Sequence, residues 1–417
     1  MNKAAALIIC LGMMMLTSCT SKADSASSQQ AAVNTTLTSQ ESSADETVTD
    51  KQADDDNDDD DTNELDMTSA ETVFDSLTLD EKIGQLFIVA PETLNGEVDR
   101  YDRAESYDKS IGSNLKSYPV GGIIHFSENI IDPEQIKKFN SDLQSASRIP
   151  LFIAVDEEGG SITRIASNDS FDVKDFPDMY DIGATNDTDK AEEVGQTIGA
   201  YLKEYGFNTD FAPVADVFTN PYNTVIGTRS FASDAKTVSE MVSGCIDGFH
   251  KSGTICTLKH FPGHGDTDSD THSGYVSVSK SWEELEKCEL IPFKDNLEKT
   301  DMIMTAHITL PNVTGGTLPA SISKEILTDR LRDELGYDGV IITDSMSMGA
   351  IELNYQPGDA AVKAIDAGAD IILMPGSIKS SFEAVKAALD DGTLTIGQID
   401  KSVMRVLKLK EKYGILK

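Results

Sequence analysis

Positive charge is scarce in this sequence. Its 417 residues include 35 Lys and Arg against 71 Asp and Glu, so the formal net charge is −36. Residues 41–66 supply about a third of that excess, with thirteen acids and one Lys, and the rest of the chain is still acidic. Nucleic acids and anionic lipid surfaces bind through basic residues, so this balance argues against either as a partner of the folded part.

Cysteine is sparse as well, with five in the chain. Cys10 and Cys19 lie in the N-terminal apolar region, which leaves Cys245, Cys256 and Cys288 in apolar or helix-like surroundings. An odd number in such places implies no disulfide framework. We expect buried free thiols instead.

Long apolar runs are almost absent. Only residues 4–16, after Lys3, form one, and it is too short to span a bilayer as a mature helix. Leu16-Thr17-Ser18-Cys19 follows at once and resembles the cleavage site of a bacterial lipoprotein signal peptide. We therefore expect removal of residues 1–18, lipidation of Cys19, and an extracytoplasmic protein held at the cell envelope by that lipid alone. An ordinary secretory signal or an uncleaved anchor is the alternative.

Large apolar side chains are also rare in residues 19–68, which are rich in Ser, Thr and Asp. Residues 54–61 form a block of acids that repel one another, so the segment cannot bury enough apolar surface to fold. We interpret it as a disordered acidic tether, with a tail of no specific use as the alternative. The predicted layout is a signal peptide over 1–18, a linker over 19–68 and a folded domain over 69–417.

The folded part alternates short apolar runs with amphipathic stretches. Eight runs read as strands buried on both faces: 86–89, 122–126, 151–155, 209–212, 254–259, 302–306, 340–343 and 371–374. Helix-like stretches between them cover 133–145, 190–205, 235–251, 282–299, 324–335 and 380–391. Eight such units predict an α/β fold, a single (β/α)₈ TIM-type barrel. A doubly wound sheet is the alternative, but no glycine-rich dinucleotide or phosphate loop supports it.

Residues 259–274 form the segment richest in reactive groups, with three of the six histidines and three aspartates among glycines. A solvated polar loop is the simplest interpretation. A calcium loop is disfavoured because Thr271 and Ser277 stand where Gly and Glu are needed. A zinc site is disfavoured because Pro262 and Gly263 keep His260 and His264 from lying one helical turn apart.

Acid–base chemistry is the remaining interpretation of this segment. Asp270 lies two residues before His272, so in an extended chain both side chains project to one side. A carboxylate beside an imidazole orients it and raises its pKa, which suits a proton donor.

Polar residues also follow several of the other predicted strands. Asp156 and Glu157 follow the third, His307 the sixth and Asp344 the seventh. A barrel places its active site at this end of the strands. Each residue alone could be a helix cap or a satisfied polar group, and capping is an open alternative for Asp344.

Six motifs, in this order and spacing, resemble glycoside hydrolase family 3 in its β-N-acetylhexosaminidase branch. The resemblance runs from about Leu77 to the C-terminus. The motifs are the opening helix at 77–86, the second strand at 121–126, the third-strand motif at 156–160 with Arg164, the fourth-strand loop at 225–231, the branch signature at 259–274 and the nucleophile strand at 339–346.

The resemblance implies a role for each matched residue. Asp344 matches the catalytic nucleophile, and His272 with Asp270 matches the acid/base dyad. The positions that hold the terminal sugar are matched by Asp156, Arg164, Arg229, Lys259 and His260, while His264 shapes the same signature loop. Glu157 and Ser161 depart from the commoner form of the motif, which puts only the fit of the substrate in doubt.

The resemblance also implies an activity. We expect a retaining exo-β-N-acetylglucosaminidase, monomeric, without cofactor or metal, that acts on peptidoglycan-derived saccharides. Since the chain ends soon after the expected barrel, we expect no second domain to donate a catalytic carboxylate. This expectation favours His272 as the proton donor. The alternatives are a phosphorylase, a β-glucosidase or xylosidase, and a surface lipoprotein that binds sugar without turnover.

Overall fold

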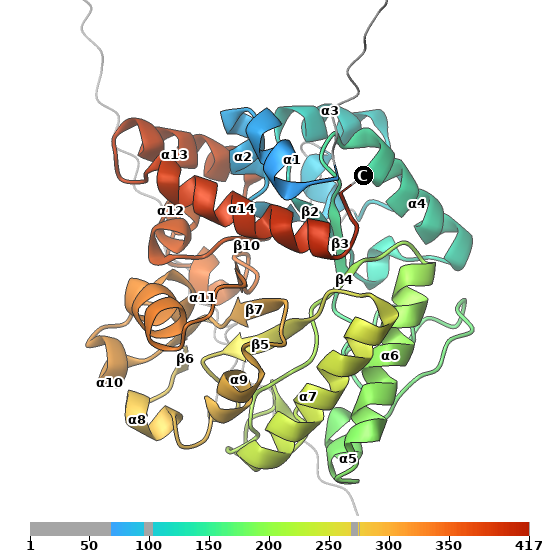
Figure 1. Cartoon of the computed structure of the whole chain (residues 1–417), viewed down its shortest axis with the longest axis vertical. Coiled ribbons are helices and arrows are strands. Elements are labelled where there is room, and N and C mark those ends of the chain that lie inside the picture. Colours follow the sequence, from blue (N-terminus) through green and yellow to red (C-terminus); the bar gives the residue numbers. More distant parts are fainter. Residues whose placement is uncertain (1–67, 96–102, 268–273, 275, 417) are drawn as a thin grey trace, which may run out of the picture. The chain divides into compact units, whose positions relative to one another are not determined.

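The computed structural model describes residues 68–95, 103–267, 274 and 276–416 (Figure 1). The described part opens with α1 (Ala70–Ser76) and α2 (Leu79–Gly84). Thr78 begins α2 with a capping box, in which its hydroxyl accepts the Glu81 N–H and the Glu81 carboxylate accepts the Thr78 N–H. Among the described residues, no helix has the length and apolar character that crossing a membrane requires.

All eight predicted strands are present, although most are shorter than expected. They are β1 (Phe87–Val89), β2 (Gly122–Ile124), β3 (Phe152–Val155), β4 (Thr209–Asp210), β5 (Thr257–Phe261), β7 (Met302–Thr305), β9 (Val340–Thr343) and β10 (Ile372–Leu373). The parallel pairings follow the order β10-β1-β2-β3-β4 in one sheet and β5-β7-β9 in another. The fold is therefore α/β and built on parallel strands.

Two seams join these sheets. Thr209 bridges to Ile255 just before β5, and Ile342 of β9 bridges to Ile371 just before β10. Backbone bonds run across both, including the Asp210 N–H to the Ile255 carbonyl at 2.8 Å and the Thr343 N–H to the Ile371 carbonyl at 3.0 Å. The pairings thus return to their starting strand, as in a closed barrel.

Helices follow the strands along the chain and cover the outer face (Figure 1). They are α3 (Lys109–Ser117), α4 (Pro133–Ala146), α5 (Met179–Gly183), α6 (Thr188–Glu204), α7 (Ala235–Ser252), α8 (Trp282–Leu285), α9 (Ile291–Asn296), α10 (Pro311–Thr314), α11 (Gly349–Glu352), α12 (Pro357–Ala367), α13 (Ile378–Asp390) and α14 (Ile396–Lys412). Short 3₁₀ turns are η1 (Pro91–Leu94), η2 (Ser127–Asn129), η3 (Gly227–Arg229) and η5 (Ala320–Ile322). A further pair of two-residue strands, β6 (Val276–Ser277) and β8 (Ile308–Thr309), stands apart from the ring.

One helical prediction needs correction, and one predicted helix is of an unusual type. The stretch 282–299 forms two short helices, α8 and α9, rather than one. Pro292 lies in the first turn of α9, where its missing N–H is harmless, but it could not continue a helix arriving from α8. The stretch 324–335 forms a π-helix, η6 (Glu325–Glu334), which ends with the Leu335 N–H donating to the Arg330 carbonyl.

Strand side chains alternate between two cores. Ile341 of β9 packs in the outer core against the helices, whereas its neighbours Val340 and Ile342 pack in the inner core enclosed by the strands. Val406 and Leu409 of α14 join this inner core. Further along α14, Lys410 bonds to groups that precede β1 and β3, so the helix covers the end of the ring where strands begin. The opposite end is left for the loops.

Candidate active site

A cavity of about 700 Å³ lies at the C-terminal ends of the strands, a volume that suits a small ligand. Seven of the nine expected substrate-site residues line it: Asp156, Arg164, Arg229, Lys259, His260, His264 and Asp344. The other two, Asp270 and His272, lie outside the described residues, as does Cys19. The structure therefore gathers residues from four different strand ends and loops around one space, and the roles of these residues stay predictions.

Asp344 directly follows β9. Its N–H donates to the Thr305 carbonyl of β7 at 3.0 Å, so strand pairing continues up to this residue. One carboxylate oxygen, Oδ1, accepts the Ser345 N–H at 2.7 Å. The next helix, α11, begins only at Gly349 and Met348 precedes it, so the interpretation of Asp344 as a helix cap is wrong.

The surroundings of Asp344 favour its charged form. Burial alone would raise its pKa, but the charges of His260 and His307, the Ser345 N–H and Lys259 together lower the pKa below the usual value. A carboxylate must be ionised to act as a nucleophile, and this one is ionised at neutral pH. His260 and His307 lower this pKa more than Lys259 does.

His307 is fixed beside Asp344 by two partners. Its Nε2 lies 2.8 Å from the Ser345 carbonyl, and its Nδ1 lies 2.7 Å from the Ser321 hydroxyl. A carbonyl can only accept, so Nε2 carries a proton and donates. His307 thereby holds the backbone immediately after Asp344.

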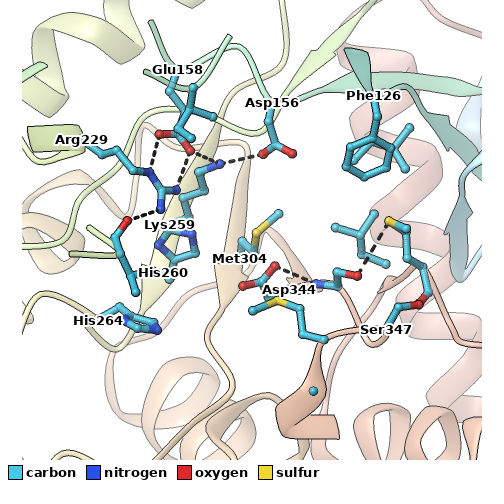
Figure 2. Close-up of a pocket in the computed structure, with 18 of the residues that line it drawn as sticks. Phe126, Asp156, Glu158, Arg229, Lys259, His260, His264, Met304, Asp344 and Ser347 are labelled. Carbon is cyan, nitrogen blue, oxygen red and sulfur yellow. Dashed lines mark hydrogen bonds and ion pairs between the residues drawn. The ribbon is translucent and has the colours of Figure 1, made fainter. Parts of the chain in front are cut away.

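A cluster of four charges forms another wall of the cavity (Figure 2). The Lys259 ammonium lies 2.7 Å from Asp156 Oδ1 and 2.6 Å from Glu158 Oε1. Arg229 donates to Glu158 through Nε at 2.8 Å and Nη2 at 2.7 Å, a bidentate pair. Two positive and two negative groups compensate one another, which permits their burial.

Glu158 holds this cluster together and was missed in the sequence. Burial would raise its pKa, but Arg229 and Lys259 outweigh burial and hold the pKa far below its usual range. A signal was available, because Glu158 stands two positions after Asp156 and an extended chain directs both to one side. Its part is to position Lys259 and Arg229.

Glu157 anchors the loop that carries Arg164. Its carboxylate accepts the N–H groups of Arg164 at 2.5 Å, Ile165 at 3.0 Å and Ala166 at 2.9 Å, and the Tyr201 hydroxyl at 2.8 Å. Both oxygens are used, which a glutamine could not match because its amide nitrogen would face donors. The departure from the commoner motif at this position thus has a structural use.

Asp216 is a second positioning residue that sequence reasoning missed. Its Oδ2 lies 2.7 Å from His260 Nδ1, and its Oδ1 accepts the His264 N–H at 2.6 Å. Burial would raise the pKa of Asp216, but the facing histidines lower it. A polar residue inside the apolar run after β4 was the available signal. Asp216 fixes the His260 ring and the start of the signature loop.

The signature loop is also held at His264 and Thr267. The Thr267 hydroxyl bonds to His264 Nδ1 at 2.9 Å, and the Asn223 amide donates to the His264 carbonyl at 2.8 Å. Burial lowers the pKa of His264. Val276, two residues after this segment, pairs with Ile308 in the strands β6 and β8.

Comparison with known proteins adds independent evidence. Residues 78–409 match the model of the glycosyl hydrolase family 3 N terminal domain. β-Hexosaminidase A of Pseudoalteromonas piscicida is 37% identical over 327 residues, which are 72% of this chain and 54% of that protein. The chain thus spans about half the length of that relative.

Solved structures agree with this match. A glycoside hydrolase family 3 β-N-acetylglucosaminidase from Paenibacillus sp. has a TM-score of 0.76 and 36% identity, over 82% of this chain and 63% of that one. A β-glucoside phosphorylase, BglX, bound to 2FGlc, has a TM-score of 0.73 and 26% identity, over 84% and 61%.

Proposed function

Because the chain belongs to glycosyl hydrolase family 3, we propose that it is a retaining exo-β-N-acetylglucosaminidase that releases terminal, non-reducing N-acetylglucosamine. One observation carries the proposal: the half-buried, ionised Asp344 shares a cavity with the charged group of Asp156, Glu158, Arg229 and Lys259. The relatives named as β-hexosaminidase and β-N-acetylglucosaminidase support the choice of sugar.

In the proposed reaction, Asp344 attacks the anomeric carbon and forms a covalent glycosyl ester. His272 gives a proton to the departing glycosidic oxygen and then takes one from the water that hydrolyses the ester. Asp270 fixes the tautomer of His272. Retaining enzymes commonly pair two carboxyl groups, so an imidazole here replaces the second one.

The charged wall binds the sugar. Asp156 can accept hydrogen bonds from sugar hydroxyls, and Lys259 and Arg229 can donate them, while Glu158 keeps both cations in place. Because these groups are already paired with one another, they need little rearrangement when substrate enters. Arg164, held by Glu157, lines the same cavity and completes this wall.

We propose peptidoglycan fragments as the natural substrate and the cell envelope as the location, with Cys19 as the lipid anchor. The signal-like sequence before Cys19 supports the location and the anchor. A Cys19→Ser variant should move from the membrane fraction to the soluble fraction of the producing cells. Equal membrane association of the variant and the wild type would contradict the anchor without touching the catalytic proposal.

Phosphorolysis is the second candidate function, because the solved phosphorylase has the same fold over 84% of this chain. Phosphate would replace water in the second step and leave a sugar 1-phosphate. A neutral imidazole in place of a carboxylate repels phosphate less, which is consistent with either acceptor.

One assay separates these candidates. The full chain is incubated with nitrophenyl β-N-acetylglucosaminide and with nitrophenyl β-glucoside, each with and without phosphate. We expect release from the first substrate, free N-acetylglucosamine as the product and no change of product with phosphate. Sugar 1-phosphate would favour phosphorolysis, and faster cleavage of the glucoside would overturn the proposed sugar.

A further inference from the structure

Three potential metal ligands of different chemistry converge outside the cavity. They are His250 in the last turn of α7, Cys256 just before β5 and Asp301 just before β7. Their ligand atoms all lie within 4.8 Å of one another. The residues stand six and forty-five positions apart, so no sequence motif marks the group.

The spacing of the three atoms fits one ion. Cys256 Sγ lies 3.8 Å from His250 Nε2 and 3.5 Å from Asp301 Oδ2, and the last two atoms lie 3.1 Å apart. Tetrahedral zinc with ordinary bond lengths would space sulfur, nitrogen and oxygen ligands at about 3.6, 3.6 and 3.4 Å in the same order. Each observed separation is within about 0.3 Å of the corresponding expected one, so the three side chains would move little on binding the ion.

The carboxylate is oriented as a metal ligand would be. Lys412 occupies the other oxygen, Oδ1, at 2.6 Å, and leaves Oδ2 toward the group. The Tyr413 hydroxyl donates to Oδ2 at 2.5 Å and the Cys256 N–H donates at 3.2 Å. Supporting bonds of this kind fix ligands in protein metal sites. The Tyr413 oxygen is too close to Oδ2 to be a ligand beside it, which leaves a fourth position to water.

Burial and charge also suit a zinc-class ion. The Asp301 side chain is fully buried, Cys256 is fully buried, and the His250 side chain is 30% exposed and gives access from solvent. A thiol, an imidazole and a carboxylate together match zinc or cobalt and not calcium or magnesium, which prefer oxygen alone. Binding would displace the thiol proton, so one thiolate and one carboxylate would face the divalent ion.

We infer that His250, Cys256 and Asp301 form a binding site for a divalent ion of the zinc class at the N-terminal end of the strands. Asp344 lies at the other end, so the ion stabilises the barrel and takes no part in the reaction. The site joins the end of α7 to the starts of β5 and β7, and through Lys412 and Tyr413 to the end of α14.

Cobalt tests this directly, because a thiolate bound to Co²⁺ gives a charge-transfer band in the near ultraviolet that histidine and carboxylate ligands do not give. The full chain, reduced and without a histidine tag, is titrated with Co²⁺. We expect the band to saturate at one ion per chain and to disappear when Zn²⁺ is added. No band, or a band that survives in Cys256→Ser, would overturn the site.

Cys245→Ser is the matched control. Cys245 is another buried thiol, on the same helix as His250, but the described hydrogen bonds give it no imidazole or carboxylate partner. We expect this variant to keep the full band. Loss of the band in Cys245→Ser with retention in Cys256→Ser would contradict the assignment.

A second variant guards against a folding defect in Cys256→Ser. His250→Gln alters the partly exposed ligand, and we expect a loss of Co²⁺ affinity of at least about tenfold, since even changes beside a metal ligand cost that much. At the same Zn²⁺ concentration, the thermal midpoint of the wild type should rise more than that of His250→Gln, because the variant binds the ion more weakly. An equal rise in both would overturn the site.

Discussion

Asp344 is the residue on which turnover depends in the proposed mechanism. Asp344→Ala should lower kcat by a factor on the order of 10⁴ or more, because the covalent step loses its nucleophile. Added azide should restore part of the rate by attacking the anomeric carbon from the vacated space. Nitrophenyl release with and without azide is the measurement, and full activity of the variant would reject the nucleophile.

His272 is the proton donor in the proposed mechanism. His272→Ala should lose about 10²- to 10⁴-fold in rate on substrates with poor leaving groups, which need a proton. The loss should be much smaller on nitrophenyl substrates with acidic leaving groups. A plot of rate against leaving-group pKa for wild type and variant measures this, and parallel lines would argue against a proton donor.

Glu157 should affect the sugar site through Arg164. Glu157→Gln keeps the size of the side chain but turns an amide toward backbone donors, so the loop after Gly160 should loosen. We expect kcat/KM to fall about tenfold, mainly through KM, from a loss of about 1.4 kcal/mol of binding. Ser161→Ala, in the same motif, is the control and should stay within twofold.

At the scale of elements, α14 contains a buried cation. Lys410 bonds to Gln85 Oε1 at 2.7 Å and to the Pro150 carbonyl at 2.6 Å, and it lies over the Phe152 ring. Burial lowers its pKa to about 7. The unfolded chain therefore binds more protons than the folded one between about pH 7 and 10, and this group makes stability rise with pH in that window.

Two lysines of α14 should differ in their effect on the pH dependence of stability. From pH 7 to 8.5, Lys410 should contribute about 1.5 kcal/mol of added stability, and Lys410→Met should lose that slope. Lys408→Met, at an exposed position of α14, should keep it. Urea midpoints at the two pH values measure the slopes, and identical slopes in all three proteins would contradict the assignment.

Helices and strands were predictable from sequence where the apolar residues recur with one clear period. The strands were found because each is a short apolar run between glycine and polar residues, and the helices 133–146 and 235–252 because their apolar stripe is regular. The break at Pro292 could have been predicted from the sequence, because proline interrupts a helix. The π-helix could not, because its wider turns have no local sequence signal.

The site was predictable in part for a similar reason. Asp344 and Lys259 stand in motifs at strand ends, so local sequence and resemblance marked them. Glu158, Asp216 and His307 hold groups that lie 38 to 71 residues away along the chain. Local sequence could mark these residues as polar positions near strand ends, but it could not identify their partners. The group of His250, Cys256 and Asp301 escaped notice for the same reason.

At the scale of the whole molecule, acid sensitivity follows from buried groups. His125 is fully buried between Phe139 and Phe207, and burial lowers its pKa to about 4. The unfolded chain binds this proton more readily, so the stability due to a neutral His125 is present above about pH 6.5 and is lost as the pH falls toward 4. Glu158, Asp301 and Asp344, whose pKa values are lowered, add to the loss at still lower pH.

The acid side of the stability curve tests this. Between pH 7 and 4 the wild type should lose about 3 kcal/mol through His125 alone. His125→Phe should fall less steeply over that range, even if its stability at pH 7 is lower. Urea midpoints across the range give both slopes. A variant that declines as steeply as the wild type would show that His125 is not the group responsible.

The ring of strands separates the residues of the cavity from a group of residues that stabilise the fold. The cavity with Asp344 lies at one rim, while Lys410, Asp301 and the C-terminal end of α14 close the other. Substitutions at the closed rim should therefore change how long the enzyme survives heating and leave its choice of sugar alone. Thermal stability could therefore be raised by substitutions at the closed rim, in the laboratory or in evolution, without a change in substrate specificity.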